Sequence, residues 1–389
     1  MEDIRIERIC AIALGKVFGY EPLYVTGLIS RLGSAAAIFD LSTEEIDGLL
    51  GPGSKYRGMV SAQVLREAEA ELEELERRGW GYVASTEAAF PAALKECQDC
   101  PAGLYYRASS PPEEFFADGP AIAVVGTRDI SPYGREWTRK IVDACSQAPV
   151  RPAIISGLAF GVDINAHLTA LEKGLRTIAV LPCGIDGIYP AAHRQIAERI
   201  IGSKGSALVT DYPLRTSPVA FTFIRRNRII AGLAQSTLLI ESKAKGGGLI
   251  TCRLADGYGR QVFALPGRVD DIRSAGCNAL IREGVAEAVT GLSGIGEQLG
   301  LGRYRLRKKE DLISRLNTCY SGRLDTIGLN QMLRIAELIR EERGIDLEEL
   351  CIRSGQPYNE VARTATMLES DGFICLDLMG RCTINERKS

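Results

Sequence analysis

Short apolar runs recur through the middle of the chain and predict the strands of a parallel sheet. They are nearly continuous in Val, Ile, Leu and Ala, which is typical of strands that are buried on both faces. Segments with helical spacing of apolar residues separate them, and this alternation indicates a doubly wound, Rossmann-like α/β core. The predicted strands are residues 122–125, 153–155, 177–181, 207–210, 237–240 and 261–265.

The pattern is different before this core. Residues 1–80 show short helical segments that Gly, Ser or Asp open or close. The turns RLGS and LLGPGS are similar to those of helix-hairpin-helix and SAM-like modules, so we expect a small all-helical domain at this end. Its longest helix carries the acidic run EAEAELEELE, which we interpret as a solvated face.

After the core, the pattern predicts three helices and a hairpin, the outline of a winged-helix domain over residues 330–389. The third helix offers Arg363 as its one basic residue, whereas helices that read a DNA groove need several polar contacts, so we expect this domain to bind protein. Residues 81–290 then form the Rossmann-like domain, and residues 291–329, with the basic tract RYRLRKK at 303–309, form a linker. The helices are expected at 333–340, 346–353 and 357–370, and the strands at 373–378 and 381–384.

Composition is that of an ordinary globular protein, with 46% hydrophobic and 25% charged residues in a chain of 389. No apolar run approaches a membrane span, and the acidic start MEDIRIERIC differs from a signal peptide, so we expect a cytoplasmic protein without membrane contact.

The net charge of −2 hides a gradient. Residues 1–119 carry 11 Lys and Arg against 20 Asp and Glu, whereas residues 120–287 carry 21 against 14. The basic middle predicts an anionic ligand there, and the acidic front argues against DNA contact by the first domain.

The sequence gives little support to a metal or a cofactor. Eleven cysteines show no disulfide framework, and Cys97 and Cys100 form one CxxC without a second that would complete a zinc site. The dinucleotide fingerprint GxGxxG is absent, which disfavours NAD and FAD. We expect no cofactor and no metal, and structural roles for these two cysteines and for Cys183.

Glycine and polar residues gather where the predicted strands end. Ligands of a doubly wound sheet bind at the carboxyl ends of its strands, so these residues form the candidate site. Arg128 stands at one strand tip, where it can fork onto a phosphate or, in a plainer alternative, pair with a neighbouring carboxylate. The stretches are Gly126-Thr127-Arg128, Ser156-Gly157, Pro182-Cys183-Gly184, Asp211-Tyr212-Pro213, residues 243–248 and Pro266-Gly267-Arg268.

The loop KGGGLIT at 245–251 is the strongest candidate for a phosphate site. It follows a predicted strand and opens a helix, so its backbone N–H groups and the helix macrodipole favour an anion. Its glycines let phosphate oxygens approach the main chain, and Lys243 and Lys245 stand beside them. Three successive glycines are also compatible with a simple flexible turn.

The segment FTFIRRNRIIAGL at 221–233 combines three arginines with an apolar face. Arg225, Arg226 and Arg228 cannot all point the same way from one helix. We expect at least one of them to reach the crevice and another to hold an acidic side chain. Asn227 is a candidate for a base or backbone contact.

A further pair of residues and a tyrosine leave alternatives open. Asp163 and His167 lie four residues apart on a predicted helix, where an acid–base pair or half of a metal site is conceivable. A local hydrogen bond that fixes the helix against its loop is the simpler interpretation. Tyr189 is equally compatible with stacking on a base and with packing.

Seven strings, taken in order, resemble motifs of the DNA-processing protein A (DprA, or Smf) family. The resemblance implies a bacterial cytoplasmic protein without turnover chemistry. Such a protein binds single-stranded DNA, dimerises through its Rossmann-like domain and loads the RecA recombinase in natural transformation. It implies a DNA contact for Arg128 through the GTR match, while Phe160 stands where some members have a basic residue and offers a ring for base stacking. The strings are VGTRDISPYG, SGLAFGVDINAH, VLPCGIDGIYPAAH, TDYPLRTSPVAFTFIRRNRIIAGLA, KGGGLIT, VFALPGR and AGCNALIREG.

Two other functions compete with this hypothesis. One is a phosphoribohydrolase-like enzyme that uses the same glycine-rich loop; its PGGxGTxxE signature is missing, and Glu241 is the carboxylate to suspect. The other is a structural adaptor whose end domains recruit partners. The candidate DNA contacts are Gly126, Thr127, Arg128, Ser156, Gly157, Phe160, Arg225, Arg226, Asn227, Arg228, Lys243, Lys245, Gly246, Gly247, Gly248 and Arg268.

Overall fold

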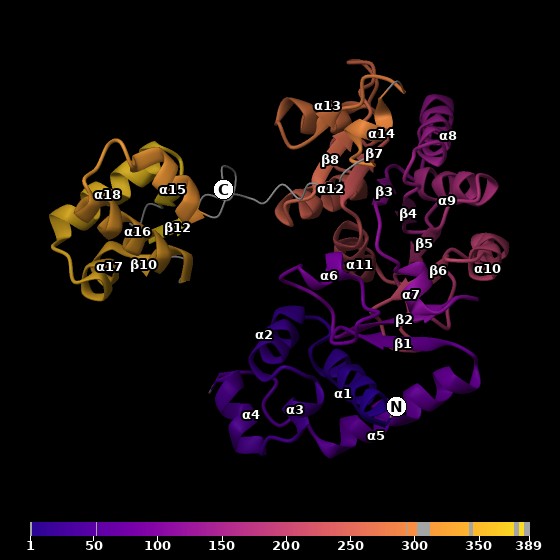
Figure 1. Ribbon diagram of the computed structural model, residues 1–389, viewed down its shortest axis with the longest axis horizontal. Helices are drawn as coiled ribbons and strands as arrows, with labels where there is room; N and C mark the ends of the chain where they lie inside the picture. The colour runs from indigo at the N-terminus through magenta and orange to yellow at the C-terminus, as the bar shows by residue number, and fades with distance from the viewer. Residues whose placement is uncertain are drawn as a thin grey trace. The chain divides into compact units, whose positions relative to one another are not determined.

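One sheet organises most of the chain in the computed structural model of the protein (Figure 1). Its described strands are β1 (Gly81–Ala84), β2 (Gly103–Arg107), β3 (Ala121–Val125), β4 (Ala153–Ser156), β5 (Thr177–Val180), β6 (Ala207–Thr210), β7 (Ser236–Leu239), β8 (Gln261–Ala264) and β9 (Glu287–Ala288). They pair in the order β1-β2-β6-β5-β4-β3-β7-β8-β9, and neighbours are parallel except at the β1–β2 and β2–β6 pairs. The predicted α/β fold with a mostly parallel sheet is confirmed, and the six predicted strands are present to within one residue at each end.

The structure describes residues 2–51, 53–292, 294–301, 312–341, 345–376 and 381–384. They fall into two compact units, residues 1–306 and 307–389. In the described ranges no helix combines the length and the apolar character that a membrane span requires. The basic tract at 303–309 and the centre of the predicted hairpin at 377–380 lie outside these ranges.

Helices cover both faces of the sheet. Alternate residues of one strand point to opposite faces, so Val124 packs into the core under α8 and α9, whereas Val125 packs into the core under α11 and α12. The first face carries α8 (Pro132–Ser146), α9 (Val162–Glu172), the short helix Ala191–His193, α10 (Arg194–Gly202) and α14 (Ile295–Gln298). The second carries α6 (Ala92–Lys95), α7 (Pro112–Phe115), α11 (Ala220–Leu233), α12 (Gly247–Gly257) and α13 (Ala275–Arg282).

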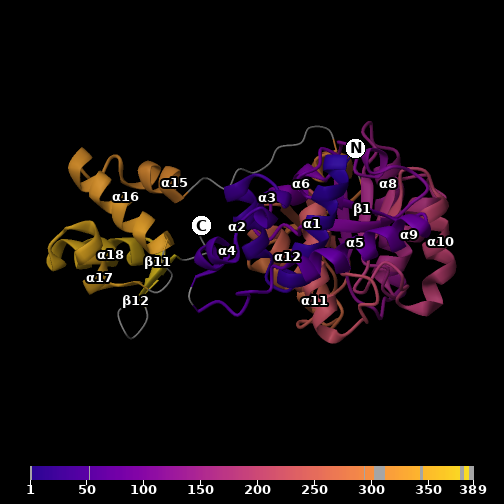
Figure 2. The same cartoon turned by 90° about the horizontal axis from the view of Figure 1, so that it is seen from below.

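The front of the chain is helical, as the turn signals predict. Its helices are α1 (Glu2–Phe18), α2 (Pro22–Leu32), α3 (Ala36–Phe39), α4 (Thr43–Leu50) and α5 (Ala62–Arg77). They do not pack by themselves, because Leu72 of α5 lies in one hydrophobic core with Tyr82, Tyr105 and Leu208 of the sheet. This packing fixes the front helices against β1 at the edge of the sheet and against its neighbours β2 and β6. Figure 2 shows α1 and α5 beside β1.

The acidic run of α5 is only partly a solvated face. The expectation that the whole run is solvated is wrong for one carboxylate, that of Glu71. Glu71 is 7% exposed. Its carboxylate accepts a hydrogen bond of 2.7 Å from the Lys16 ammonium and one of 2.8 Å from the backbone N–H of Leu214. A half-buried cation and a buried N–H donor therefore share one anionic acceptor, which ties α5 to α1 and to the segment after β6.

The second unit has its own core, to which Tyr320, Ile335, Leu350 and Leu368 contribute. Its helices are α15 (Leu312–Tyr320), α16 (Thr326–Glu341), α17 (Leu347–Ser354) and α18 (Tyr358–Ser370). Its strands β10 (Ile345–Asp346), β11 (Ile374–Leu376) and β12 (Arg381–Ile384) pair antiparallel in the order β10-β12-β11. The predicted linker at 291–329 thus contains α14, which packs on the large sheet, and α15, which packs in this second core.

The internal acceptor on α5 yields a stability prediction. Glu71→Ala leaves the Lys16 ammonium and the Leu214 N–H without their acceptor, so we expect the free energy of unfolding to fall by about 2–4 kcal/mol. Urea denaturation followed by circular dichroism measures the change. Glu73→Ala is the matched control on the same helix, because its side chain is 58% exposed; it should change the free energy by less than about 0.5 kcal/mol. Equal losses of unfolding free energy in the two variants would contradict this role of Glu71.

Candidate functional site

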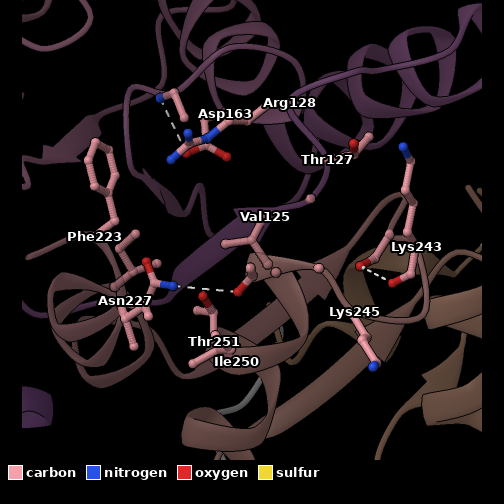
Figure 3. Close-up of a pocket in the computed structure, with 18 of the residues that line it drawn as sticks. Val125, Thr127, Arg128, Asp163, Phe223, Asn227, Lys243, Lys245, Ile250 and Thr251 are labelled. Carbon is pink, nitrogen blue, oxygen red and sulfur yellow. Dashed lines mark hydrogen bonds between the residues drawn. The ribbon is translucent and has the colours of Figure 1, made fainter. Parts of the chain in front are cut away.

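The order of the strands reverses direction between β3 and β7, and a pocket of about 420 Å³ opens at the carboxyl ends of these two strands. From β3 the chain adds β4, β5 and β6 on one side, whereas β7 is followed by β8 and β9 on the other. Loops that leave adjacent strands in opposite directions form the crevice in which doubly wound sheets bind ligands. We call this hollow the cradle pocket (Figure 3).

The loop between β7 and α12 forms one wall of the cradle pocket. Gly246 is the N-cap of α12, and Gly247 and Gly248 form the start of its first turn, where backbone N–H groups have no partner inside the helix. Lys243 and Lys245 are exposed on the same loop, and neither forms an ion pair with a described carboxylate. The helix terminus and the two ammonium groups therefore create a positive potential in the pocket.

Glycine is required where this loop meets the loop after β3. A Cβ on Gly248 would stand 2.7 Å from Leu239 Cδ1 and 3.3 Å from the Cα of Gly126, so two backbones pack directly on each other. A Cβ on Gly126 would stand 2.5 Å from Val162 Cγ2. In contrast, a Cβ on Gly247 would have no atom within 4 Å, because this glycine faces open space at the pocket. The glycines thus serve two different purposes.

Arg128 lies on the opposite wall, on a turn that hydrogen bonds hold in place. The N–H of Thr127 donates to the carbonyl of Glu241 at 2.8 Å, and the N–H of Asp129 donates to Thr127 Oγ1 at 3.1 Å. Arg128 is exposed, its guanidinium lies 4.8 Å from the centre of the Phe223 ring, and it has no ion pair with a described carboxylate. A face-on aromatic ring positions a cation without neutralising its charge.

Some contacts of the cradle pocket have no signal in the sequence. Asp129 lines the pocket, but Arg273 from the segment before α13 pairs with it at 3.0 Å and offsets its negative charge. Phe223, Ile224 and Ile250 add apolar surface. Figure 3 places Phe223 and Asn227 on the side of the pocket away from Lys243 and Lys245. Apolar side chains therefore lie beside the cations of the pocket, and Phe223 lies against Arg128 itself.

Arg226 lines the cradle pocket from below and is 4% exposed. Its guanidinium donates to the carbonyl of Gly157 at 2.8 Å and to that of Val180, which joins the ends of β4 and β5 to α11. Burial lowers the pKa of Arg226 to about 10, against the opposing effect of the Asp163 carboxylate, so the group stays cationic at neutral pH. Asp163 in turn accepts from the N–H of Gly157 at 3.0 Å and shapes the loop after β4.

The other two arginines of α11 point away from the cradle pocket. Arg228 is 5% exposed and pairs with Asp211, which confirms that one arginine of this helix holds an acidic side chain. Arg225 donates to the carbonyls of Gly19 and Tyr20 in the turn between α1 and α2. Neither arginine therefore lies at the rim of the crevice, where the sequence predicted DNA contacts. The spacing of the three arginines shows that they diverge, but it does not show where each one goes.

A family comparison places these features among known proteins. The model of the family described as DNA recombination-mediator protein A matches residues 81–300, which are more than half of the chain and include every residue that lines the cradle pocket. The chain belongs to this family. The resemblance drawn from seven motifs is thereby confirmed.

Curated relatives from several bacteria agree with this assignment. Protein Smf of Escherichia coli is 35% identical over 285 residues, which are 73% of this chain and 72% of that protein. DNA processing protein DprA of Streptococcus pneumoniae is 37% identical over 208 residues, 54% of this chain and 71% of that protein. For protein Smf of Synechocystis the match is 38% identical over 215 residues and spans about half, 52%, of that protein's length.

Two solved structures of family members share the fold. The X-ray structure of DNA processing protein A from Streptococcus pneumoniae has a TM-score of 0.57 at 28% identity and covers 77% of this chain and 96% of its own. DNA processing protein A from Helicobacter pylori, described for its single-stranded DNA binding mode, has a TM-score of 0.51 at 27% identity and covers 57% and 97%. The α/β fold with its mostly parallel sheet is therefore shared with these members of the family.

Besides Arg225 and Arg228, four further candidate contacts lie outside the cradle pocket in this member of the family. Ser156 is buried and donates to the carbonyl of Val124 at 2.6 Å. The Arg226 guanidinium occupies the space that a Cβ on Gly157 would need, so glycine at this position makes room for that arginine. Phe160 is 49% exposed and packs against the ring of His193, with centroids 4.6 Å apart. Arg268 is exposed and pairs with Asp270 at 2.9 Å.

The groups suspected of chemistry are held in structural contacts. Glu241 is 1% exposed, both of its carboxylate oxygens accept from Ser131, and it does not line the cradle pocket. Asp163 and His167 do not bond to each other; His167 Nδ1 lies 2.7 Å from Thr177 Oγ1, and burial lowers the pKa of His167 to about 3. Burial also raises the pKa of the Cys183 thiol to about 11.

The two glycine roles in the loop before α12 give a matched pair of variants. Gly248→Ala drives a methyl group into Leu239 and the Gly126 backbone, so we expect the free energy of unfolding to fall by about 1–3 kcal/mol. Gly247→Ala meets open space and replaces glycine in a helix, so stability should be unchanged or rise by up to about 1 kcal/mol. Denaturant unfolding measures both. A loss in Gly247→Ala as large as that in Gly248→Ala would contradict the glycine geometry.

Proposed function

We propose that the protein binds single-stranded DNA in the cradle pocket and acts in DNA recombination, as its family membership supports. The carrying observation is the set of cations without described carboxylate partners, Arg128, Lys243 and Lys245, around the N-terminus of α12. Each side chain attracts phosphate, and the N–H groups of the helix terminus supply donors. The single-stranded DNA binding mode described for the Helicobacter pylori relative supports the same ligand.

The dimensions and lining of the cradle pocket favour an unpaired strand. A volume of about 420 Å³ accommodates a nucleotide-sized group but not a duplex. Phe223, Ile224 and Ile250 offer apolar contacts to sugars or bases, and such contacts tolerate any base because every base has a π-face. Asn227 donates to the carbonyl of Gly247 at 3.5 Å and supports the loop from the α11 side. We therefore infer binding without sequence preference.

Further steps of the proposal concern partners. We propose that the protein forms a homodimer through its Rossmann-like domain and delivers single strands to the RecA recombinase, in the recombination of DNA taken up by the cell. The second unit, residues 307–389, is proposed as a winged helix that contacts protein. Helix α18 supports this role, because its inner positions Val361, Ala365 and Leu368 are buried and its outer face offers one arginine, Arg363, among the described basic residues.

The cationic wall predicts the response to salt. The affinity for single-stranded oligonucleotides should fall steeply as salt rises, and Arg128→Ala should weaken binding about tenfold for every sequence and make the log–log salt slope shallower by about 0.7. Fluorescence anisotropy at several salt concentrations measures both quantities. Arg139→Ala removes the same charge from α8, where the side chain is 64% exposed and outside the pocket, and it should have little effect. A flat salt response would overturn the proposed ligand.

Deleting residues 307–389 separates DNA binding from partner contact. The larger unit keeps its whole hydrophobic core in this variant, so its affinity for single-stranded DNA should stay within about threefold of the full chain. The same two proteins are then compared for assembly of RecA on DNA that is already covered by single-strand binding protein. Full assembly without the second unit would contradict its role as a protein contact, and lost DNA binding would show that the second unit grips DNA.

A further inference from the structure

A second pocket, of about 520 Å³, lies where the front helices meet the segment after β6. We call it the junction pocket. Its walls come from α1, from the loop before α5 and the first turns of that helix, and from the turn that leads from β6 to α11. Positions 15 and 58 are glycines, and a Cβ on either would have no atom within 4 Å, so this wall is open. The junction pocket is larger than the cradle pocket. None of the contacts described above for the cradle pocket involves it.

Exposed apolar side chains connect the two pockets along α11. Ile224 lines the cradle pocket and is 52% exposed. Phe221, one turn earlier on the same face, is 54% exposed, and its ring centre lies 5.7 Å from that of Tyr20. Tyr20 is 59% exposed and lines the junction pocket. These side chains form an exposed apolar line from one pocket to the other, and the aromatic rings in it offer stacking surfaces to the bases of a single strand.

Arg225 fixes Tyr20 in this line. Its guanidinium donates to the carbonyls of Gly19 and Tyr20 and lies 5.6 Å from the centre of the Tyr20 ring. Burial lowers the pKa of Arg225. Arg225 is thus a positioning residue, which holds the turn between α1 and α2 against α11. This role explains why an arginine near the cradle pocket points away from it.

The charges of the junction pocket favour a base over a phosphate. Lys16 is the cation among its lining residues, and Glu71 already neutralises it at 2.7 Å. Glu67 adds a carboxylate at the opening. On the inner wall, Asp211 pairs with Arg228 through Oδ2, while its Oδ1 is buried and has no hydrogen-bond partner among the described residues. Such surroundings repel phosphate, whereas a nucleobase is uncharged and its N–H groups can donate to the exposed Glu67 carboxylate.

We propose that bound single-stranded DNA continues from the cradle pocket across Ile224 and Phe221 onto Tyr20, and that one unstacked base enters the junction pocket. This inference rests on the proposed binding of single-stranded DNA and extends its site to the front helices. The cradle pocket holds the sugar–phosphate chain by charge. The extension contributes stacking and a base-sized cavity, and it uses the front of the molecule, which carries a net negative charge.

Oligonucleotide length tests the extension. Oligothymidylates of about 4 and about 12 nucleotides are compared by anisotropy, because only the longer one reaches beyond the cradle pocket. Tyr20→Ala should weaken binding of the longer strand about tenfold and leave the shorter strand unaffected. The salt slope should stay unchanged, because the lost contact is to a base. Tyr20→Phe keeps the ring and should bind both strands as the unchanged protein does.

A fluorescent base gives an independent readout. A 2-aminopurine in the outer half of the longer strand should lose fluorescence on binding through stacking, and Tyr20→Ala should abolish that loss. Phe221→Ala supplies a second variant with the same expected length dependence. Equal affinities of Tyr20→Ala and the unchanged protein for the longer strand would overturn the extension. Unchanged DNA affinity together with weakened RecA assembly would also overturn it and assign the junction pocket to a protein.

The test separates this inference from the proposed function. If Arg128→Ala leaves the affinity for both strand lengths unchanged, the cradle pocket is not the DNA site and the proposed function fails. If Arg128→Ala weakens both and Tyr20→Ala weakens neither, single-stranded DNA binds the cradle pocket but does not extend over α11. Thermal unfolding of each variant confirms that the fold is retained, as expected for side chains that are more than half exposed.

Discussion

The burial of two arginines of α11, with a third half-buried, is the constraint on which the rest of the molecule depends. A guanidinium that leaves water is costly unless acceptors surround it, and each of these three finds acceptors on a different element. Arg225 bonds to the turn after α1, Arg226 to the ends of β4 and β5, and Arg228 to Asp211 after β6. One helix therefore fixes the front helices, the strand ends and the sheet edge relative to one another.

The cradle pocket owes its charge to the cations that this arrangement leaves unpaired. Arg226 supports the loop after β4 from below, and the contact between Gly126 and Gly248 brings the loops after β3 and β7 together. Arg128 and Lys243 then project from a rigid base toward a helix terminus. Asp129 is paired with Arg273, and no carboxylate among the residues that the structure describes forms an ion pair with these two cations, so both can meet an anionic group.

The strands, the crevice and the position of the glycine-rich loop could be predicted because each depends on local sequence. Continuous apolar runs specify buried parallel strands, and glycines after a strand specify close backbone approach. Partners across the fold could not be predicted in this way. Nothing near Glu71 indicates that it meets Leu214, and nothing near Asp129 indicates Arg273. Strands β1 and β2 are also too short to show a clear alternation, and they are held by the pairing of β2 with β6 and by packing against the front helices.

The charge gradient along the chain has a physical consequence for the proposed path of DNA. The basic middle supplies cations without carboxylate partners among the described residues, whereas the junction pocket offers a lysine that Glu71 neutralises and an aspartate that Arg228 pairs with. A polynucleotide that passes from one region to the other gains little from its phosphates in the second region. Contact there has to come from its bases, because stacking on Phe221 and Tyr20 does not depend on charge. The two regions therefore suit the two chemically different parts of one strand.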